Sequence, residues 1–377
     1  MADVYNWQLG RKMQYQYEEH RPKRQVAYVF DPNKCIACQT CTIACKQTWT
    51  WGAGQEYMLW NNVETKPYGF FPTGWDVMLM ALLGPGEWQN GTYQGKTIFE
   101  SAPQGERVQG WLPGDEDWAH PNLGEDEPLG VAAQGTYIPD TPHDMWFHYM
   151  PRICNHCTYP GCLAACPRQA IYKREEDGIV LVDQERCRGY QECTRGCPYK
   201  KVFFNNETRV SEKCIACYPK VEEGIMPQCV TSCIGRIRMM GFISGPDEEP
   251  DPNNPLDYMI RVKKIALPLY PQAGTEPNVY YIPPIHVEPS YLHQLFGPGV
   301  EHAIETYSTT KTDDHLLGLM MLFGCTDRIL HSFEVRDGIA YGYDDKGEEI
   351  VSVPIDEPTF IREYFDEVHG NYMMNIT

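Results

Sequence analysis

The chain has 377 residues, of which 42% are hydrophobic, and 51 acidic against 32 basic residues give it a formal net charge of -19. A chain of this length can hold two or three domains with a sizeable core. The large negative charge argues against binding to nucleic acid and to anionic membrane surfaces.

Residues 1–24 are polar, and we expect them to form an extended N-terminal arm. They contain neither the apolar core and cleavage site of a secretory signal nor a twin arginine. The most apolar stretch, Leu316–Cys325, is shorter than the roughly 18 residues that span a membrane. The sequence therefore predicts a soluble chain with no direct membrane span, which relies on a partner for any export or membrane contact.

The first chemical motif follows a predicted strand at Gln25–Phe30 and consists of Cys35, Cys38, Cys41 and Cys45. Its C-x2-C-x2-C-x3-C spacing is typical of ferredoxin-type proteins that bind iron–sulfur cubes. The residues from Cys41 to Trp49 suit a short helix. The plan of strand, acidic turn and cysteine loop recurs at Ile179–Cys187, as expected of a repeated ferredoxin-like unit.

A long segment without cysteine separates this motif from the next one. Between Gly84 and Pro142 it is rich in glycine, proline and acidic residues, which predicts an insertion of loops. Its four tryptophans are Trp88, Trp111, Trp118 and Trp146. They indicate packing either on a larger partner subunit or on the chain's own core.

Eleven of the sixteen cysteines then fall between Cys154 and Cys233. They form three further runs: Cys154, Cys157, Cys162 and Cys166; Cys187, Cys193 and Cys197; and Cys214, Cys217, Cys229 and Cys233. Three cysteines on one tight loop reach one cube, and the fourth ligates the other cluster of a pair, so each run needs a partner run.

Pairing the middle two runs with each other, and the outer two with each other, gives four ligand sets. These sets are Cys35, Cys38, Cys41 and Cys233; Cys45, Cys214, Cys217 and Cys229; Cys154, Cys157, Cys162 and Cys197; and Cys166, Cys187 and Cys193. The first three predict [4Fe-4S] clusters, and the last set has only three thiolates.

The missing ligand belongs to the third run, where Tyr190 occupies the position of the second cysteine. A [3Fe-4S] cluster is the predicted outcome, with a higher potential than its neighbours. The alternative is that Tyr190 is a packing aromatic and that an outside residue completes a four-iron cluster.

Two other uses of cysteine compete with this interpretation. Cys214, Cys217, Cys229 and Cys233 would fit a zinc site, but zinc does not explain the Cys-Pro endings at Cys166 and Cys197. A disulfide framework is typical of small secreted domains that lack a core. Cys325 lies outside every run, and we expect it to be a buried core thiol.

Charge also varies along the chain. Residues 151–240 carry fourteen basic and ten acidic side chains, against the acidic trend elsewhere. Because thiolate-ligated clusters are anionic, a locally basic protein shell would offset their charge.

After the last run we expect a strand at Ile234–Phe242 and then an extended strap at Leu267–Pro284, which is too rich in proline for a helix or an inner strand. Helices within residues 289–332 and a tail of hairpin and short helix should follow. The predicted fold class is α+β, with two ferredoxin-like double-cluster modules. The predicted domains are an arm (1–24), module A (25–60 with 200–242), an acidic loop insertion (61–146), module B (147–199), and a strap with a C-terminal docking region (243–377).

Several phrases of the sequence resemble one family. They are PRICNHCTYPGCLAACPRQAIYKR, CRGYQECTRGCPYKK, SEKCIACYP and LPLYPQAGTEPNVYYIPP. Together with the four runs and Tyr190, they resemble the electron-transfer β subunits of the complex iron–sulfur molybdoenzymes. Within that family, CVTSCIGRIRM and FGPGVEHAIE are most similar to the nitrite oxidoreductase β subunit.

The resemblance implies an electron wire that has no catalytic residues of its own. Its partners would be a catalytic α subunit with molybdenum bis-pterin and a γ subunit with haem b. The set with Cys35 would face the α subunit, and the set with Cys187 would face the haem. The reaction would be that of nitrite oxidoreductase or nitrate reductase.

Alternatives remain within and outside the family. The chain could serve an ethylbenzene dehydrogenase-like complex or a selenate, chlorate or perchlorate reductase, or it could be a free-standing polyferredoxin. The resemblance also favours an extracytoplasmic location through co-export with the α subunit, with the cytoplasmic face of the membrane as the alternative.

Overall fold

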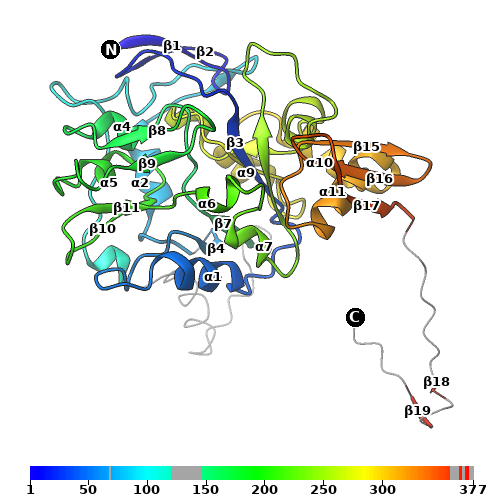
Figure 1. The fold of residues 1–377 in the computed structure, drawn as a ribbon. Coiled ribbons are helices and arrows are strands. Elements are labelled where there is room, and N and C mark those ends of the chain that lie inside the picture. Colours follow the sequence, from blue (N-terminus) through cyan, green and yellow to red (C-terminus); the bar gives the residue numbers. More distant parts are fainter. Residues whose placement is uncertain (68, 120–145, 357–364, 367–369, 373–377) are drawn as a thin grey trace, which may run out of the picture.

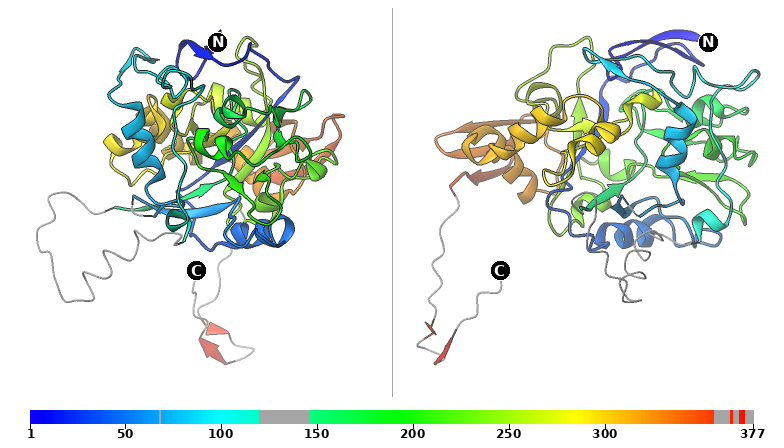
Figure 2. Two further views of the ribbon diagram at one scale, coloured as in Figure 1. Left: turned by 90° about the vertical axis from the view of Figure 1, so that its left-hand side faces the viewer. Right: turned by 180° about the vertical axis from the view of Figure 1, so that it is seen from behind.

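The computed structural model describes residues 1–67, 69–119, 146–356, 365–366 and 370–372. A four-stranded sheet runs through its centre, and its strands have the order β12, β3, β14 and β13 (Figure 1). The cysteine-bearing loops and short helices lie on one side of this sheet, and the C-terminal helices and strands lie on the other (Figures 1 and 2). No helix in the described part is long and apolar enough to cross a membrane.

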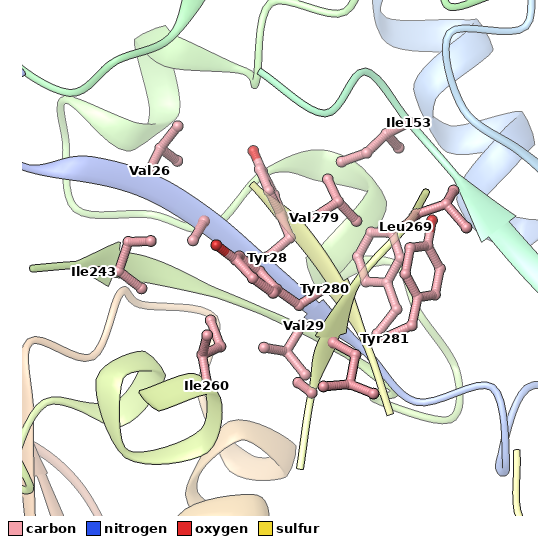
Figure 3. Packing of buried hydrophobic residues seen from close by; sticks show 14 of the residues in the cluster. Val26, Tyr28, Val29, Ile153, Ile243, Ile260, Leu269, Val279, Tyr280 and Tyr281 are labelled. Carbon is pink, nitrogen blue, oxygen red and sulfur yellow. The ribbon is translucent and has the colours of Figure 1, made fainter. Parts of the chain in front are cut away.

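The central pair of strands is β3 (Gln25–Phe30) and β12 (Arg238–Ile243), which run antiparallel. Every residue of both strands is buried, which explains why β3 has a continuous β-branched and aromatic sequence without polar alternation. Val29 and Tyr28 of β3 lie in a core that also includes Tyr281 (Figure 3). Each fully buried apolar side chain of this kind stabilises the fold by roughly 1.5–3 kcal/mol.

The proline-rich strap was predicted to contain no inner strand, and that prediction is wrong. β14 (Val279–Tyr281) lies between β3 and β13 (Leu267–Pro268) and pairs parallel to β3. The prolines at 277 and 283 flank β14 instead of interrupting it, so none removes a hydrogen bond from its ladder.

The N-terminal arm is a β-hairpin and not an extended segment. β1 (Ala2–Asn6) pairs antiparallel with β2 (Arg11–Tyr15). The hairpin is held on the core by buried Asn6, whose amide donates to the carbonyl of Gly274 at 3.1 Å. Alternate residues of both strands are buried, and this period of two is the pattern that the arm interpretation overlooked.

The cysteine-bearing region is built from very short elements. They are α1 (Thr40–Trp49), α4 (Gly161–Ala165), β8 (Ile171–Lys173), β9 (Val180–Val182), α5 (Glu192–Gly196), β10 (Val202–Phe204), β11 (Ser211–Lys213), α6 (Tyr218–Val221) and α7 (Gln228–Thr231). The order of a short helix followed by an antiparallel hairpin occurs twice, as α4-β8-β9 and α5-β10-β11. The predicted helix after Cys41 and the strand before Cys187 are confirmed.

Close contact between α4 and α5 joins these two repeats. A Cβ atom added to Gly161 would come within 2.4 Å of the carbonyl oxygen of Gly196. Only glycine allows the two helices to approach this closely. The helices carry or immediately precede Cys162, Cys166, Cys193 and Cys197, so the contact brings two cysteine runs together.

The insertion contains β4 (Asn62–Lys66), α2 (Trp75–Leu83), β5 (Trp88–Gln89), β6 (Thr92–Tyr93) and η1 (Glu116–Trp118). Residues 120–145 lie outside the described part, and β7 (His148–Arg152) follows the insertion and pairs with β4. Its tryptophans pack on this chain. Trp118 lies edge-on against Phe71, and Lys200 lies 3.7 Å from the centre of the Trp111 ring. Trp146 lies 4.6 Å from Tyr291, so these residues support the own-core alternative.

The C-terminal region contains α8 (Pro255–Asp257), η3 (Tyr258–Val262), η4 (Pro271–Ala273), α9 (Pro289–Phe296), α10 (Val300–Ser308), η5 (Thr310–Thr312), α11 (Asp314–Cys325), β15 (Ser332–Arg336), β16 (Ile339–Tyr343), β17 (Glu349–Pro354), β18 (Phe365–Asp366) and β19 (Asn371–Tyr372). The predicted helices and hairpin are present, and the described tail residues form no helix. Cys325 is exposed, so the expected buried thiol is wrong: it is the last residue of α11, beyond the buried Leu322 and Phe323.

A buried ion network fastens the insertion to the cysteine-bearing region. Glu64 accepts hydrogen bonds from Arg152 and from the indole of Trp75, and Lys66 lies 3.2 Å from it. Burial alone would raise the pKa of Glu64, but the charges of Arg152 and Lys66 lower it from 4.5 to about 2. The carboxylate therefore remains ionised in the core.

We predict that Glu64→Gln destabilises the protein by about 3–5 kcal/mol, because buried Arg152 then loses its carboxylate partner and buried Lys66 keeps only Asp76. The contribution of Glu64 is present above its ordinary pKa of 4.5 and is lost as the pH falls towards 2. Urea unfolding at pH 7, followed by circular dichroism, measures the change. The control is Glu334→Gln, whose exposed pair with Arg336 should contribute at most about 1 kcal/mol. Equal unfolding midpoints for both variants would contradict this prediction.

Candidate metal centres

The four cysteine loops share one backbone turn. The third residue of each loop has a positive φ: 52° at Ala37, 42° at His156, 68° at Gly189 and 54° at Ala216. In three loops a cysteine follows this residue, and in the fourth loop Tyr190 follows Gly189. Tyr190 therefore occupies the place of a ligand on a loop whose backbone matches the other three. Its side chain is 62% exposed, which does not fit a packing aromatic.

The first thiol group forms where the chain leaves β3 and where it enters β12. Burial raises the pKa of Cys35, and the charges of Cys41 and Cys233 raise it further, so these three sulfurs lie in one another's field. Cys38, on the same loop, is exposed, and a hydrogen bond from the Thr40 side chain lowers its pKa.

The second group lies between α1, α6 and α7. Burial raises the pKa of Cys45 strongly, and Cys214, Cys229 and Cys217 raise it further. The indole of Trp49 donates a hydrogen bond to Cys217 Sγ at 3.1 Å. Contact between α1 and α7 brings Cys45 beside a loop that is almost 170 residues further along the chain.

The third group lines one small cavity. All four of its predicted ligands, Cys154, Cys157, Cys162 and Cys197, face this cavity. Burial raises the pKa of Cys162 most, and the nearby thiols of Cys197, Cys154 and Cys157 add to the shift. This arrangement is expected of four sulfurs that each bind a different iron of one iron–sulfur cube.

The fourth group has three members. Burial raises the pKa of Cys193 to about 11, and Cys166 and Cys187 contribute, while a hydrogen bond with Ser211 opposes the rise. The backbone N–H of Ser211 also donates to Cys187 Sγ at 3.4 Å, and that of Ala170 donates to Cys166 Sγ at 3.3 Å.

These groups fit iron–sulfur clusters better than a single ion. Cys233 interacts with Cys35 whereas Cys229 interacts with Cys45 and Cys217, so the four cysteines proposed for zinc divide between two groups. In the described part, no three His, Cys, Asp or Glu side chains converge closely enough to bind one metal ion. A cube needs wider spacing, because each cysteine binds a different iron.

Two buried polar groups without a hydrogen-bond partner among the described residues also fit iron–sulfur clusters. The hydroxyl of Tyr28 and Nε2 of His156 are buried and have no hydrogen-bond partner among the described residues. Tyr28 lies in the field of Cys214, Cys229, Cys217 and Cys154, and His156 lies between Cys154 and Cys157 in the sequence. Because Nδ1 of His156 accepts from Val180 N–H, the free nitrogen carries the proton. Both groups can donate to an acceptor such as a cluster sulfide.

Buried cations accompany the thiol groups, and the sequence did not single them out. Lys213 interacts with Cys162 and Cys214, Lys201 with Cys45 and Cys214, and Arg238 with Cys41 and Cys229. All three side chains are at most 2% exposed. The basic shell expected for residues 151–240 thus includes charges inside the core. The excess of basic residues was visible in the sequence, but their burial was not.

Comparison with known proteins identifies the class. Residues 145–243 match the 4Fe-4S dicluster domain, so the mixed α/β fold contains a ferredoxin-like dicluster unit. The chain is 45% identical to the chlorate reductase β subunit of Ideonella dechloratans over 75% of this chain and 90% of the relative. It is 43% identical to the selenate reductase β subunit of Thauera selenatis, with the same two coverages. It is 42% identical to the respiratory nitrate reductase β subunit of Haloferax mediterranei, covering 75% and 84%.

The fold, the thiol groups and these likenesses define an electron-transfer iron–sulfur protein. The chain belongs to the iron–sulfur β subunits of the molybdoenzyme family. The relatives named above are β subunits of chlorate, selenate and nitrate reductases. The exact ligand sets and the division into two modules stay predictions.

We predict that removing the iron with a chelator under oxidising conditions unfolds the cysteine-bearing region. Without iron the thiols become neutral, and Lys213 and Arg238 are left as buried charges without anionic partners. Hydrogen exchange should show loss of protection in β3 and β12. The sheet β15–β17, which contains no cysteine, is the internal control and should keep its protection. Native-like protection of β3 after complete iron removal would contradict the prediction.

Proposed function

We propose that the chain holds three [4Fe-4S] clusters and one [3Fe-4S] cluster. The ligands would be Cys35, Cys38, Cys41 and Cys233; Cys45, Cys214, Cys217 and Cys229; Cys154, Cys157, Cys162 and Cys197; and Cys166, Cys187 and Cys193. The observation that carries this proposal is the grouping of the sulfurs, since each set contains thiols that lie in one another's field.

The fourth set supports a three-iron cluster, because the loop that begins at Cys187 has the same backbone turn as the other cysteine loops and lacks only the thiolate of a second cysteine. Gly189 has a positive φ, as do the residues that precede Cys38, Cys157 and Cys217. Tyr190 is exposed at the place of the second cysteine. The fourth group would therefore offer a cluster three sulfurs and one open corner.

The groups also support a linear order for the relay. Cys229 of the second group interacts with Cys41 of the first, and Cys214 of the second interacts with Cys154 of the third. The third and fourth groups are joined by α4 and α5, which carry members of both. When bound, such clusters accept and pass on single electrons. The polypeptide fixes their order, buries them and supplies N–H donors to their sulfurs.

We predict about fifteen irons per chain and an electron paramagnetic signal from a three-iron centre in the oxidised protein. Tyr190→Cys restores the ligand spacing and should raise the iron content by about one while abolishing that signal. The control is Tyr172→Cys, which adds an exposed thiol elsewhere and should change neither quantity. A three-iron signal that persists in Tyr190→Cys would place the open corner at another site.

We further propose that the electrons travel between a molybdenum bis-pterin in the α subunit and haem b in a γ subunit, and that the complex interconverts nitrite and nitrate. The nitrate reductase relative and the nitrite oxidoreductase-like phrases CVTSCIGRIRM and FGPGVEHAIE support this substrate pair. Reduction of chlorate or selenate is the second candidate, because the β subunits of such enzymes share 45% and 43% identity with this chain. An extracytoplasmic location by co-export with the α subunit completes the proposal.

The native complex tests these proposals together. An affinity tag on this chain should recover a molybdenum subunit and a haem subunit, and a chain recovered alone would favour a diffusing polyferredoxin. The purified complex should oxidise nitrite with a dye acceptor faster than it reduces chlorate or selenate with a dye donor. The complex should also appear in the periplasm-like fraction, and recovery from the cytoplasmic side of the membrane would contradict the location.

A further inference from the structure

Arg238 is a buried cation that lies between the first two thiol groups. It begins β12, opposite Phe30 of β3, and its residue is 2% exposed. One guanidinium nitrogen, Nη2, donates to Cys41 Sγ at 3.1 Å, and the other, Nη1, donates to Asn61 Oδ1 at 2.7 Å. The guanidinium also lies 4.6 Å from the centre of the Phe30 ring, which fixes its plane.

The charge of Arg238 has anionic partners only if the nearby cysteines are thiolates. Among the described residues, no carboxylate forms an ion pair with it. Burial would lower the pKa of Arg238, but Cys41, Cys229, Cys233 and Cys35 raise it above its ordinary value. An unpaired buried charge is costly, so this position requires a negative group on the sulfur side.

The cysteines around Arg238 come from both sets. Cys41, Cys35 and Cys233 belong to the first, and Cys229 belongs to the second. The guanidinium also lowers the pKa of Cys45, which is in the second set. One fixed charge therefore acts on two neighbouring centres, and it reaches them through the interior, where screening by salt is weak.

We propose that Arg238 sets the reduction potentials of both clusters at once, as a positioning residue that donates to Cys41 and holds its charge between the two ligand sets. This inference rests on the ligand sets of the proposed function. Reduction adds an electron to an already anionic group, so a fixed positive charge stabilises the reduced form and raises the potential. Because the same charge acts on both clusters, it raises both reduction potentials. The difference between the two potentials therefore stays small, and neither cluster retains the electron.

The test is a redox titration of the native complex, followed by electron paramagnetic resonance. Arg238→Gln keeps an N–H donor but removes the charge. It should lower the reduction equilibrium constant of both clusters roughly tenfold, which corresponds to about 59 mV for one electron. Arg238→Lys keeps the charge and should retain most of the potential. The other two clusters, whose cysteines are not near Arg238, are internal controls and should not move.

A second variant avoids the removal of a buried side chain. Asn61 Nδ2 is buried and has no partner among the described residues, so Asn61→Asp removes an unpaired donor at constant size. The new carboxylate accepts from Arg238 and neutralises its charge in place. This variant should fold and should lower both potentials in the same direction as Arg238→Gln.

The matched control is Arg236→Gln, which lies on the same segment but pairs with Asp327 at the surface. Its effect should be much smaller, because exposed charges are screened. Full iron content with unchanged potentials in Arg238→Gln or Asn61→Asp would overturn the role of Arg238, as would an equal shift in Arg236→Gln. Wild-type protein that lacks two of the three four-iron clusters would instead overturn the ligand sets.

Discussion

The antiparallel pairing of β3 with β12 is the constraint on which the cysteine-bearing region depends. The two strands are about 200 residues apart in the sequence, and they pair along their whole length. The ladder continues into the loops, since Asp31 N–H donates to the carbonyl of Ile237 at 2.9 Å. Cys35 therefore lies four residues beyond Asp31, and Cys233 lies four residues before Ile237. Without this pairing, the first and last runs would have no common site.

Charge compensation is the second requirement of the core. Burial alone makes a thiolate unfavourable, and the thiols in each group raise one another's pKa. Iron removes that repulsion, and the resulting anionic group then stabilises cations that could not otherwise remain buried. Lys213 and Arg238 are placed accordingly, beside sulfurs and away from carboxylates. In the Glu64 network, by contrast, a buried carboxylate forms the ion pairs with Lys66 and Arg152.

The cysteine loops and the elements next to them could be predicted from the sequence, whereas the contacts between distant segments could be predicted only in part. Residue types predicted the strand at Gln25–Phe30 and the helix that begins at Thr40 in the structure. The spacing of the cysteines predicted the loops. The hairpin β1–β2 was missed because its buried residues alternate within a polar composition. β14 was missed because the neighbouring prolines were read as part of it. Arg238 carries no sequence signal that distinguishes it from Arg236, since only the ladder decides which of the two points inward.

The loop with Tyr190 keeps the backbone turn of the other three cysteine loops although it lacks their second cysteine. A positive φ in the third position is required if the chain is to turn around a cube, and the other loops adopt it with Ala or His at some conformational cost. Gly189 adopts it freely, so the turn does not depend on a metal–sulfur bond at the next residue. The ligand at position 190 can therefore be absent while Cys187 and Cys193 keep their places. In the proposed [3Fe-4S] cluster the open corner would lie at an exposed side chain, so the absence of one iron would cost little buried contact.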